Sequence, residues 1–133
     1  MPIALNQHRY YATTTQPKAR RAKTACTSHV LAALGICSST YHYSGTEQQM
    51  MTIARRRWSC RSVKSKLGKN PTVGGSRRKL AAAVREDASI LAFVVIVDGH
   101  ALLLDTTGKT TVDTAPRVRD QRKIRSIYAV RSK

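Results

Sequence analysis

The stretch that decides the fold is Ser-Ile-Leu-Ala-Phe-Val-Val-Ile-Val-Asp-Gly-His-Ala-Leu-Leu-Leu-Asp-Thr-Thr-Gly-Lys-Thr-Thr-Val-Asp-Thr, residues 89–114. It is the most apolar and β-branched part of the chain, a composition typical of strands. We expect three consecutive strands here, over residues 89–97, 100–105 and 110–113. Short glycine-containing junctions, such as Asp98-Gly99 between the first two strands, indicate tight turns. The stretch therefore predicts an antiparallel meander.

Periodic apolar residues upstream of this stretch predict three helices, over residues 24–35, 46–57 and 76–86. Gly35 is a typical helix stop, and Ser76 is a typical N-cap. Thr46, followed three residues later by Gln49, matches a capping box. These signals set the expected helix ends.

The remaining segments complete a single small domain. Residues 58–63 alternate weakly and favour an edge strand, residues 64–75 form a loop, and residues 123–130 have the composition of a further strand. Helices followed by an antiparallel sheet make an α+β fold, with N-terminal helices packed on a small sheet. We expect a basic N-terminal arm over residues 1–23 and the folded domain over residues 24–133.

The charge is strongly unbalanced. Lys and Arg number 24 against 7 Asp and Glu, the formal net charge is +17, and no acidic residue precedes Glu47. Such a balance implies a polyanionic neighbour. Aromatic residues are few, so we expect contact with phosphates rather than reading of bases. A basic segment also follows Pro116, up to Arg125. The expected contact residues are Lys18, Arg20, Arg21, Lys23, Arg55, Arg56, Arg57, Arg77, Arg78 and Lys79.

The cysteines argue against a disulfide framework. There are three of them, Cys26, Cys37 and Cys60, and we find no secretory signal, which favours a reducing compartment. No pair has Cys-x-x-Cys spacing, so we expect no metal and no cofactor. The long apolar run 88–104 is interrupted at Asp98-Gly99-His100, and we therefore expect no membrane span.

Three residues form a candidate catalytic set. Cys26 lies in the first turn of the first predicted helix, where the helix dipole favours a thiolate. His100 opens the second strand of the meander, and Asp113 closes the third. A thiolate nucleophile, an imidazole base and a carboxylate that orients the imidazole are the parts of a thiol hydrolase. Asp105 is the alternative carboxylate, and His29, one turn after Cys26, is the alternative histidine.

With this order of residues, the chain resembles the papain-like cysteine peptidase superfamily, and most closely its small members among bacteriocin-processing peptidases and proteins of tailed phages. The matching stretches are residues 25–35, 97–105 and 112–114, and Thr72-Val73-Gly74 before a helix is also similar. The resemblance implies a papain-like fold in which Cys26, His100 and Asp113 form the triad. It equally allows a member that keeps the fold without peptidase activity.

Three functions follow as hypotheses. The first is a small basic structural component of a large assembly, a tailed-phage virion by resemblance, present in the host cytoplasm during assembly. Its partners would be other protein subunits and, without sequence preference, nucleic acid. The second is an active thiol hydrolase, a Cys-His-Asp peptidase. The third is a subunit of a ribonucleoprotein or another nucleic-acid-associated particle.

Overall fold

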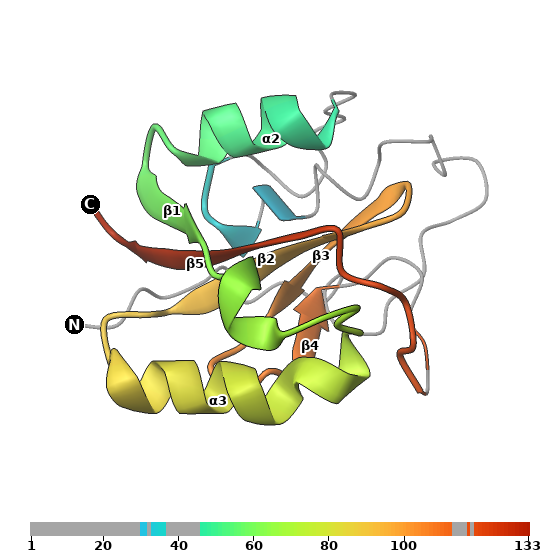
Figure 1. Ribbon diagram of the computed structural model, residues 1–133. Coiled ribbons are helices and arrows are strands. Elements are labelled where there is room, and N and C mark those ends of the chain that lie inside the picture. The colour runs from blue at the N-terminus through green and yellow to red at the C-terminus, as the bar shows by residue number, and fades with distance from the viewer. Residues whose placement is uncertain (1–29, 32, 37–45, 113–116, 118) are drawn as a thin grey trace.

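The computed structural model describes residues 30–31, 33–36, 46–112, 117 and 119–133 (Figure 1). In this part of the chain, helices and strands alternate before the meander begins. The elements in order are α2 (Glu47–Ala54), β1 (Trp58–Ser62), the 3-10 turns η2 (Lys64–Leu67) and η3 (Gly74–Ser76), α3 (Arg77–Glu86), β2 (Ala92–Val97), β3 (His100–Leu104), β4 (Thr110–Val112) and β5 (Ser126–Ser132).

The predicted meander is confirmed as β2, β3 and β4, three consecutive antiparallel strands. Val97 pairs with His100 across the Asp98-Gly99 turn, and Gly99 has a φ of 68°, a left-handed value that favours glycine. β2 starts at Ala92, later than predicted. The Asp87 carboxylate accepts the backbone N–H of Ser89 at 3.0 Å, so the residues before the strand form a local turn instead.

The last strand occupies a place that the sequence does not reveal. The strand order is β1-β5-β2-β3-β4, so β5 lies between β1 and β2. Trp58 pairs with Ser132 on one side of β5, and Ala92 pairs with Val130 on the other. β1 is an edge strand, as predicted.

Both faces of the sheet are covered, and Figure 1 shows α2 and α3 on opposite sides of it. One buried cluster joins Met50 of α2 and residues 30–31 and 33–34 to Val94 and Leu103 of the sheet. The other joins Leu80 and Ala83 of α3 to the remaining sheet side chains. The fold is therefore α+β with a small antiparallel sheet. The expectation of helices before the sheet needs one correction, because β1 precedes α3 along the chain.

The helix ends confirm some of the predicted signals. At the start of α2, the Thr46 hydroxyl accepts the N–H of Gln49 at 3.2 Å, and the Gln49 side chain accepts the N–H of Thr46 at 2.9 Å. This is the predicted capping box. Gly35, with a φ of 77°, has the left-handed conformation of a helix stop.

Two other expectations about helix ends are wrong. α2 ends at Ala54, with Arg55 as its C-cap, so the three arginines lie beyond the last turn. Ser76 makes no side-chain cap hydrogen bond and is buried at the end of η3. A 3-10 turn leads directly into α3, because Ser76 already has a helical backbone conformation. In the described residues, no helix combines the length and the apolar character needed to cross a membrane.

Candidate nucleic-acid interface

His100 is the only member of the predicted catalytic set that the structure describes, because Cys26 and Asp113 lie outside the described residues. His100 is half-buried at the start of β3. Successive side chains of a strand alternate between faces, so His100 shares its face with Leu102 and Leu104, which belong to the cluster under α3. Residues 30–31 and 33–34 pack on the other face. Because Cys26 is outside the described residues, its pairing with His100 stays a prediction.

Of the two alternative site residues, His29 and Asp105, the structure describes only Asp105. His29 lies outside the described residues. Asp105 follows β3 and accepts the backbone N–H of Thr107 at 2.8 Å and that of Lys109 at 3.0 Å. Its carboxylate thus organises the turn between β3 and β4, which gives it a structural role.

Cys60 is a buried free thiol. Burial raises its pKa, and the nearby Arg55 guanidinium lowers the pKa by a smaller amount. A thiol with a raised pKa is a poor nucleophile at neutral pH, in agreement with a packing role. No group of three or more His, Cys, Asp or Glu in the described residues is placed to hold a metal ion.

The predicted polyanion contacts fall into separate groups. Lys18, Arg20, Arg21 and Lys23 lie outside the described residues. The others form two triplets: Arg55 to Arg57 follow α2, and Arg77 to Lys79 begin α3. Because α2 and α3 lie on opposite faces of the sheet (Figure 1), these two triplets do not form one surface.

The triplet after α2 is partly engaged in packing. The Arg55 guanidinium lies over the Tyr128 ring, 5.2 Å from its centre. Arg57 lies 5.5 Å from the centre of the Trp58 ring and donates to the Gly35 carbonyl at 2.8 Å. These contacts fasten the residues after α2 to the sheet and to Gly35. A structural role therefore accounts for Arg55 and Arg57.

The triplet at the start of α3 has the opposite character. Arg77, Arg78 and Lys79 are exposed, and the first turn of α3 contains no acidic residue. The amino end of a helix carries a partial positive charge, so cations there are unfavourable without a nearby anion. The first turn of α3 therefore carries three exposed cations that the helix end itself does not favour.

Other basic segments lie beside this helix start. The Lys79 ammonium group donates to the Leu67 carbonyl at 2.9 Å, which places Lys66 and Lys69 next to α3. A Cβ on Gly108 would lie 2.9 Å from the Arg77 Cα, so the loop bearing Lys109 touches the same turn.

A third segment joins from the end of the chain. Thr72 and Lys123 form an isolated β-bridge, and Gly74 donates its N–H to the Asp120 carbonyl at 2.7 Å. Segments distant in sequence thus surround the first turn of α3. We call their exposed basic side chains the α3 rim, which comprises Lys66, Lys69, Arg77, Arg78, Lys79, Lys109 and Lys123.

The basic side chains of the α3 rim are not neutralised by ion pairs within the described part of the chain. The ion pairs found there join Arg122 to Asp120, Arg125 to Asp98 and Arg131 to Asp87. None of these pairs involves a member of the α3 rim. Unpaired, exposed lysines and arginines of this kind are suited to phosphate groups.

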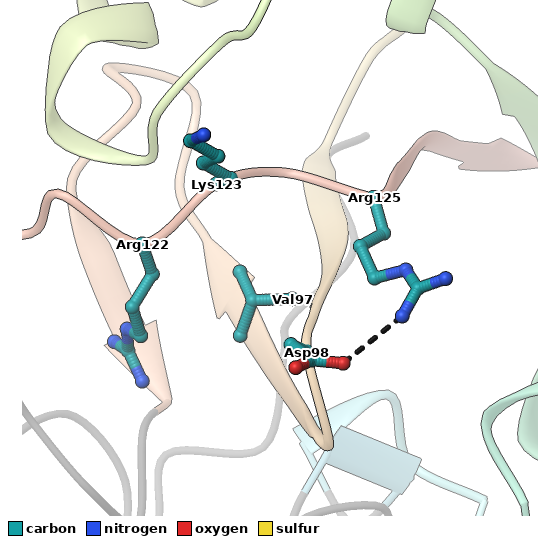
Figure 2. Close-up of a pocket in the computed structure, with 5 residues that line it drawn as sticks. All are labelled: Val97, Asp98, Arg122, Lys123 and Arg125. Carbon is teal, nitrogen blue, oxygen red and sulfur yellow. Dashed lines mark hydrogen bonds and ion pairs between the residues drawn. The ribbon is translucent and has the colours of Figure 1, made fainter.

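A hollow lies beside the α3 rim, at the end of β2. It has a volume of about 420 Å³ and is lined by Val97, Asp98, Arg122, Lys123 and Arg125. Figure 2 shows the two arginines on the side of Val97 and Asp98, whereas Lys123 points away from them. The sequence marked residues 117–125 as basic, but it gave no sign that the turn after β2 would form one wall.

Comparison with protein-family models, with curated proteins and with solved structures finds no match for this chain. The case for a function therefore depends on the chain's own charges and geometry.

Proposed function

We propose that this protein is a small basic component of a nucleoprotein assembly, and that it binds the phosphate backbone of nucleic acid through the α3 rim. The observation that carries the proposal is the gathering of separate basic segments around a helix start that contains no acidic residue. Phosphate groups would neutralise both the side chains and the partial charge of the helix end.

Contact without base reading is favoured by the positions of the aromatic rings. Of the described aromatic residues, Phe93 and Trp58 are buried, and the half-buried Tyr128 is covered by Arg55. None of these rings offers a face on which a base could stack. Binding should therefore depend on charge and little on sequence.

The wider setting remains a proposal that follows from the charge and the resemblance. The assembly would be a tailed-phage virion, with other protein subunits as further partners. A ribonucleoprotein particle has the same chemical requirement, since both present closely spaced phosphates. Co-purification of the protein with particles, followed by nuclease treatment, would separate attachment through nucleic acid from attachment through protein.

A direct binding experiment tests the proposal. The logarithm of the protein's affinity for unrelated single- and double-stranded oligonucleotides of equal length should fall linearly with the logarithm of the salt concentration. The affinities for different sequences at one salt concentration should agree within about threefold, because phosphate contacts carry no sequence information. A salt-independent affinity would contradict phosphate contact.

A second candidate function is a papain-like thiol hydrolase acting through Cys26, His100 and Asp113. The supporting observation is the meander, in which His100 begins β3 directly after a tight turn. β4 runs antiparallel to β3, with Val112 opposite Leu103, so β4 runs toward the His100 end of β3. A test of Cys26 reactivity is given in the Discussion.

A further inference from the structure

We propose that the hollow lined by Val97, Asp98, Arg122, Lys123 and Arg125 binds a terminal phosphate monoester, as found at the 5′ end of a nucleic-acid strand. The ligand phosphate would lie between the guanidinium groups of Arg122 and Arg125. The inference deepens the proposed function, since it assigns a strand end to a site adjoining the α3 rim.

The backbone that carries the two arginines is fixed on both sides. The Arg122 carbonyl accepts the N–H of Val73 at 3.0 Å. Ile124, which is buried, donates its N–H to Pro71 at 2.9 Å, and Arg125 donates its N–H to Ile96 of β2 at 2.8 Å. The spacing of the two arginine backbones is thus fixed before a ligand binds, which lowers the entropy lost on binding.

Arg122 is held in place by a carboxylate. Its Nε donates to one oxygen of Asp120 at 2.9 Å and its Nη2 to the other oxygen at 2.6 Å. The side chains of Arg122 and Asp120 are only 17% and 10% exposed. This two-pronged pair fixes the plane of the guanidinium group at the wall of the hollow.

Arg125 is held far less firmly. It pairs with Asp98 at 2.9 Å, and the two side chains are 67% and 92% exposed. Figure 2 shows this pair on the opposite side of Val97 from Arg122. Exposed pairs of this kind contribute little stability, so a dianionic phosphate can displace the Asp98 carboxylate and take over the Arg125 guanidinium.

A terminal phosphate suits this site better than an internal one. A monoester carries a charge between about −1.5 and −2 at neutral pH and has three free oxygens, which is enough to displace one carboxylate and serve two guanidinium groups. An internal diester has one charge, and the nucleic-acid strand continues from it in both directions. Two arginines, Arg122 and Arg125, belong to the lining of the hollow, so the monoester is the better match in charge.

Lys123 belongs both to the lining of the hollow and to the α3 rim. It points away from Arg122 and Arg125 in Figure 2, and its backbone bridges to Thr72 beside the start of α3. A strand whose 5′ phosphate occupies the hollow can therefore continue over Lys123 toward the α3 rim.

The experiment compares one oligonucleotide with a 5′ phosphate and with a 5′ hydroxyl, using fluorescence anisotropy at a fixed salt concentration. The wild-type protein should prefer the phosphorylated strand by about tenfold, as expected for charge-assisted hydrogen bonds. R125Q should remove this preference and leave the affinity for the hydroxyl strand within about twofold, because Arg125 is exposed and its pair is weak. D98N should raise the preference by about threefold, since it removes the competing carboxylate.

Two matched controls accompany these variants. K123Q should weaken the binding of both strands equally, because Lys123 belongs to the α3 rim and points away from Arg122 and Arg125. R61Q on the edge strand should change neither affinity. A further measurement adds free adenosine monophosphate as a competitor, and so distinguishes a strand end from a free phosphorylated molecule as the ligand. If it competes for the hollow as well as the phosphorylated strand does, the natural ligand is a free phosphorylated molecule.

The outcomes distinguish this inference from the proposed function. Equal affinity of the wild-type protein for the two strands would overturn the inference and leave backbone binding intact. A tenfold preference that persists in R125Q would also overturn it. If neither strand binds, the proposed function fails, and competition between adenosine monophosphate and a fluorescent phosphate monoester still tests the hollow.

Discussion

The Lys79 ammonium group donates a hydrogen bond to the Leu67 carbonyl at 2.9 Å. This contact ties the first turn of α3 to the end of η2 and so brings two basic segments together. A cation at the start of a helix is unfavourable by itself. Here the Leu67 carbonyl, which belongs to a second segment, accepts a hydrogen bond from the Lys79 ammonium group. Arg77 and Arg78, in the same turn, are exposed.

The first prediction concerns the stability that this contact supplies. K79M should lower the free energy of unfolding by about 1 kcal/mol, the usual contribution of such a hydrogen bond. R78M is the matched control, because Arg78 is exposed in the same turn, and it should change the stability by less than about 0.5 kcal/mol. Urea denaturation measures both values. Equal stabilities of K79M and R78M would show that the Lys79 contact does not hold the two segments together.

The capping box of α2 gives a second prediction. T46A removes the hydroxyl that accepts the N–H of Gln49 and should destabilise the protein by about 1 kcal/mol. T46S keeps the hydroxyl and should stay close to the wild type. Thermal unfolding followed by circular dichroism measures the difference, and an unchanged midpoint for T46A would contradict the role of the cap.

The pair between Asp87 and Arg131 gives a prediction about pH. Hydrogen bonds from Ser89, followed by those from Arg131, lower the pKa of Asp87 to about 2. Because the folded-state pKa is below the value in the unfolded chain, near 4, this carboxylate stabilises the protein above about pH 4. That stabilisation is lost as the pH falls from about 4 through 2.

D87N should therefore flatten the dependence of stability on pH between about 4 and 2, relative to the wild type. E86Q, a change at the neighbouring exposed carboxylate, serves as the control. Urea denaturation at a series of pH values provides the measurement. A wild-type and a D87N curve that remain parallel over this range would contradict the lowered pKa.

The thiol-hydrolase candidate is tested by the reactivity of Cys26. If His100 activates it, the rate of its alkylation by iodoacetamide at pH 7 should fall by about tenfold or more in H100Q. Mass spectrometry resolves Cys26 from Cys37 and from the buried Cys60. H29Q is the control for the alternative histidine. Equal rates in the wild type and H100Q would remove His100 from any thiol chemistry.

The local features of the fold follow from the sequence. Asp98-Gly99 marks the β2–β3 turn because few residues tolerate a φ of 68° there. Thr46 and Gln49 mark the start of α2 because their side chains bond to nearby backbone groups. Each of these signals acts over a few residues, so a single chain is enough to read it.

The features that matter for function depend on contacts between distant residues. The place of β5 between β1 and β2 depends on pairings such as Trp58 with Ser132, which no local pattern encodes. The α3 rim and the hollow arise in the same way, from the bridge between Thr72 and Lys123. The ten expected contact residues included Arg55 and Arg57, because a sequence cannot show that a basic side chain is already engaged by Tyr128 or Gly35.

The salt dependence of binding by R77Q/R78Q tests the central claim most directly. These substitutions remove two exposed guanidinium groups from the α3 rim, and R61Q/R85Q removes the same charge from exposed positions outside it. The slope of log affinity against log salt should become shallower by about 2 in R77Q/R78Q for duplex DNA, while R61Q/R85Q keeps the wild-type slope within about 0.5. If the two double variants lose affinity and slope equally, the protein binds polyanions through its overall charge, and the α3 rim is not the interface.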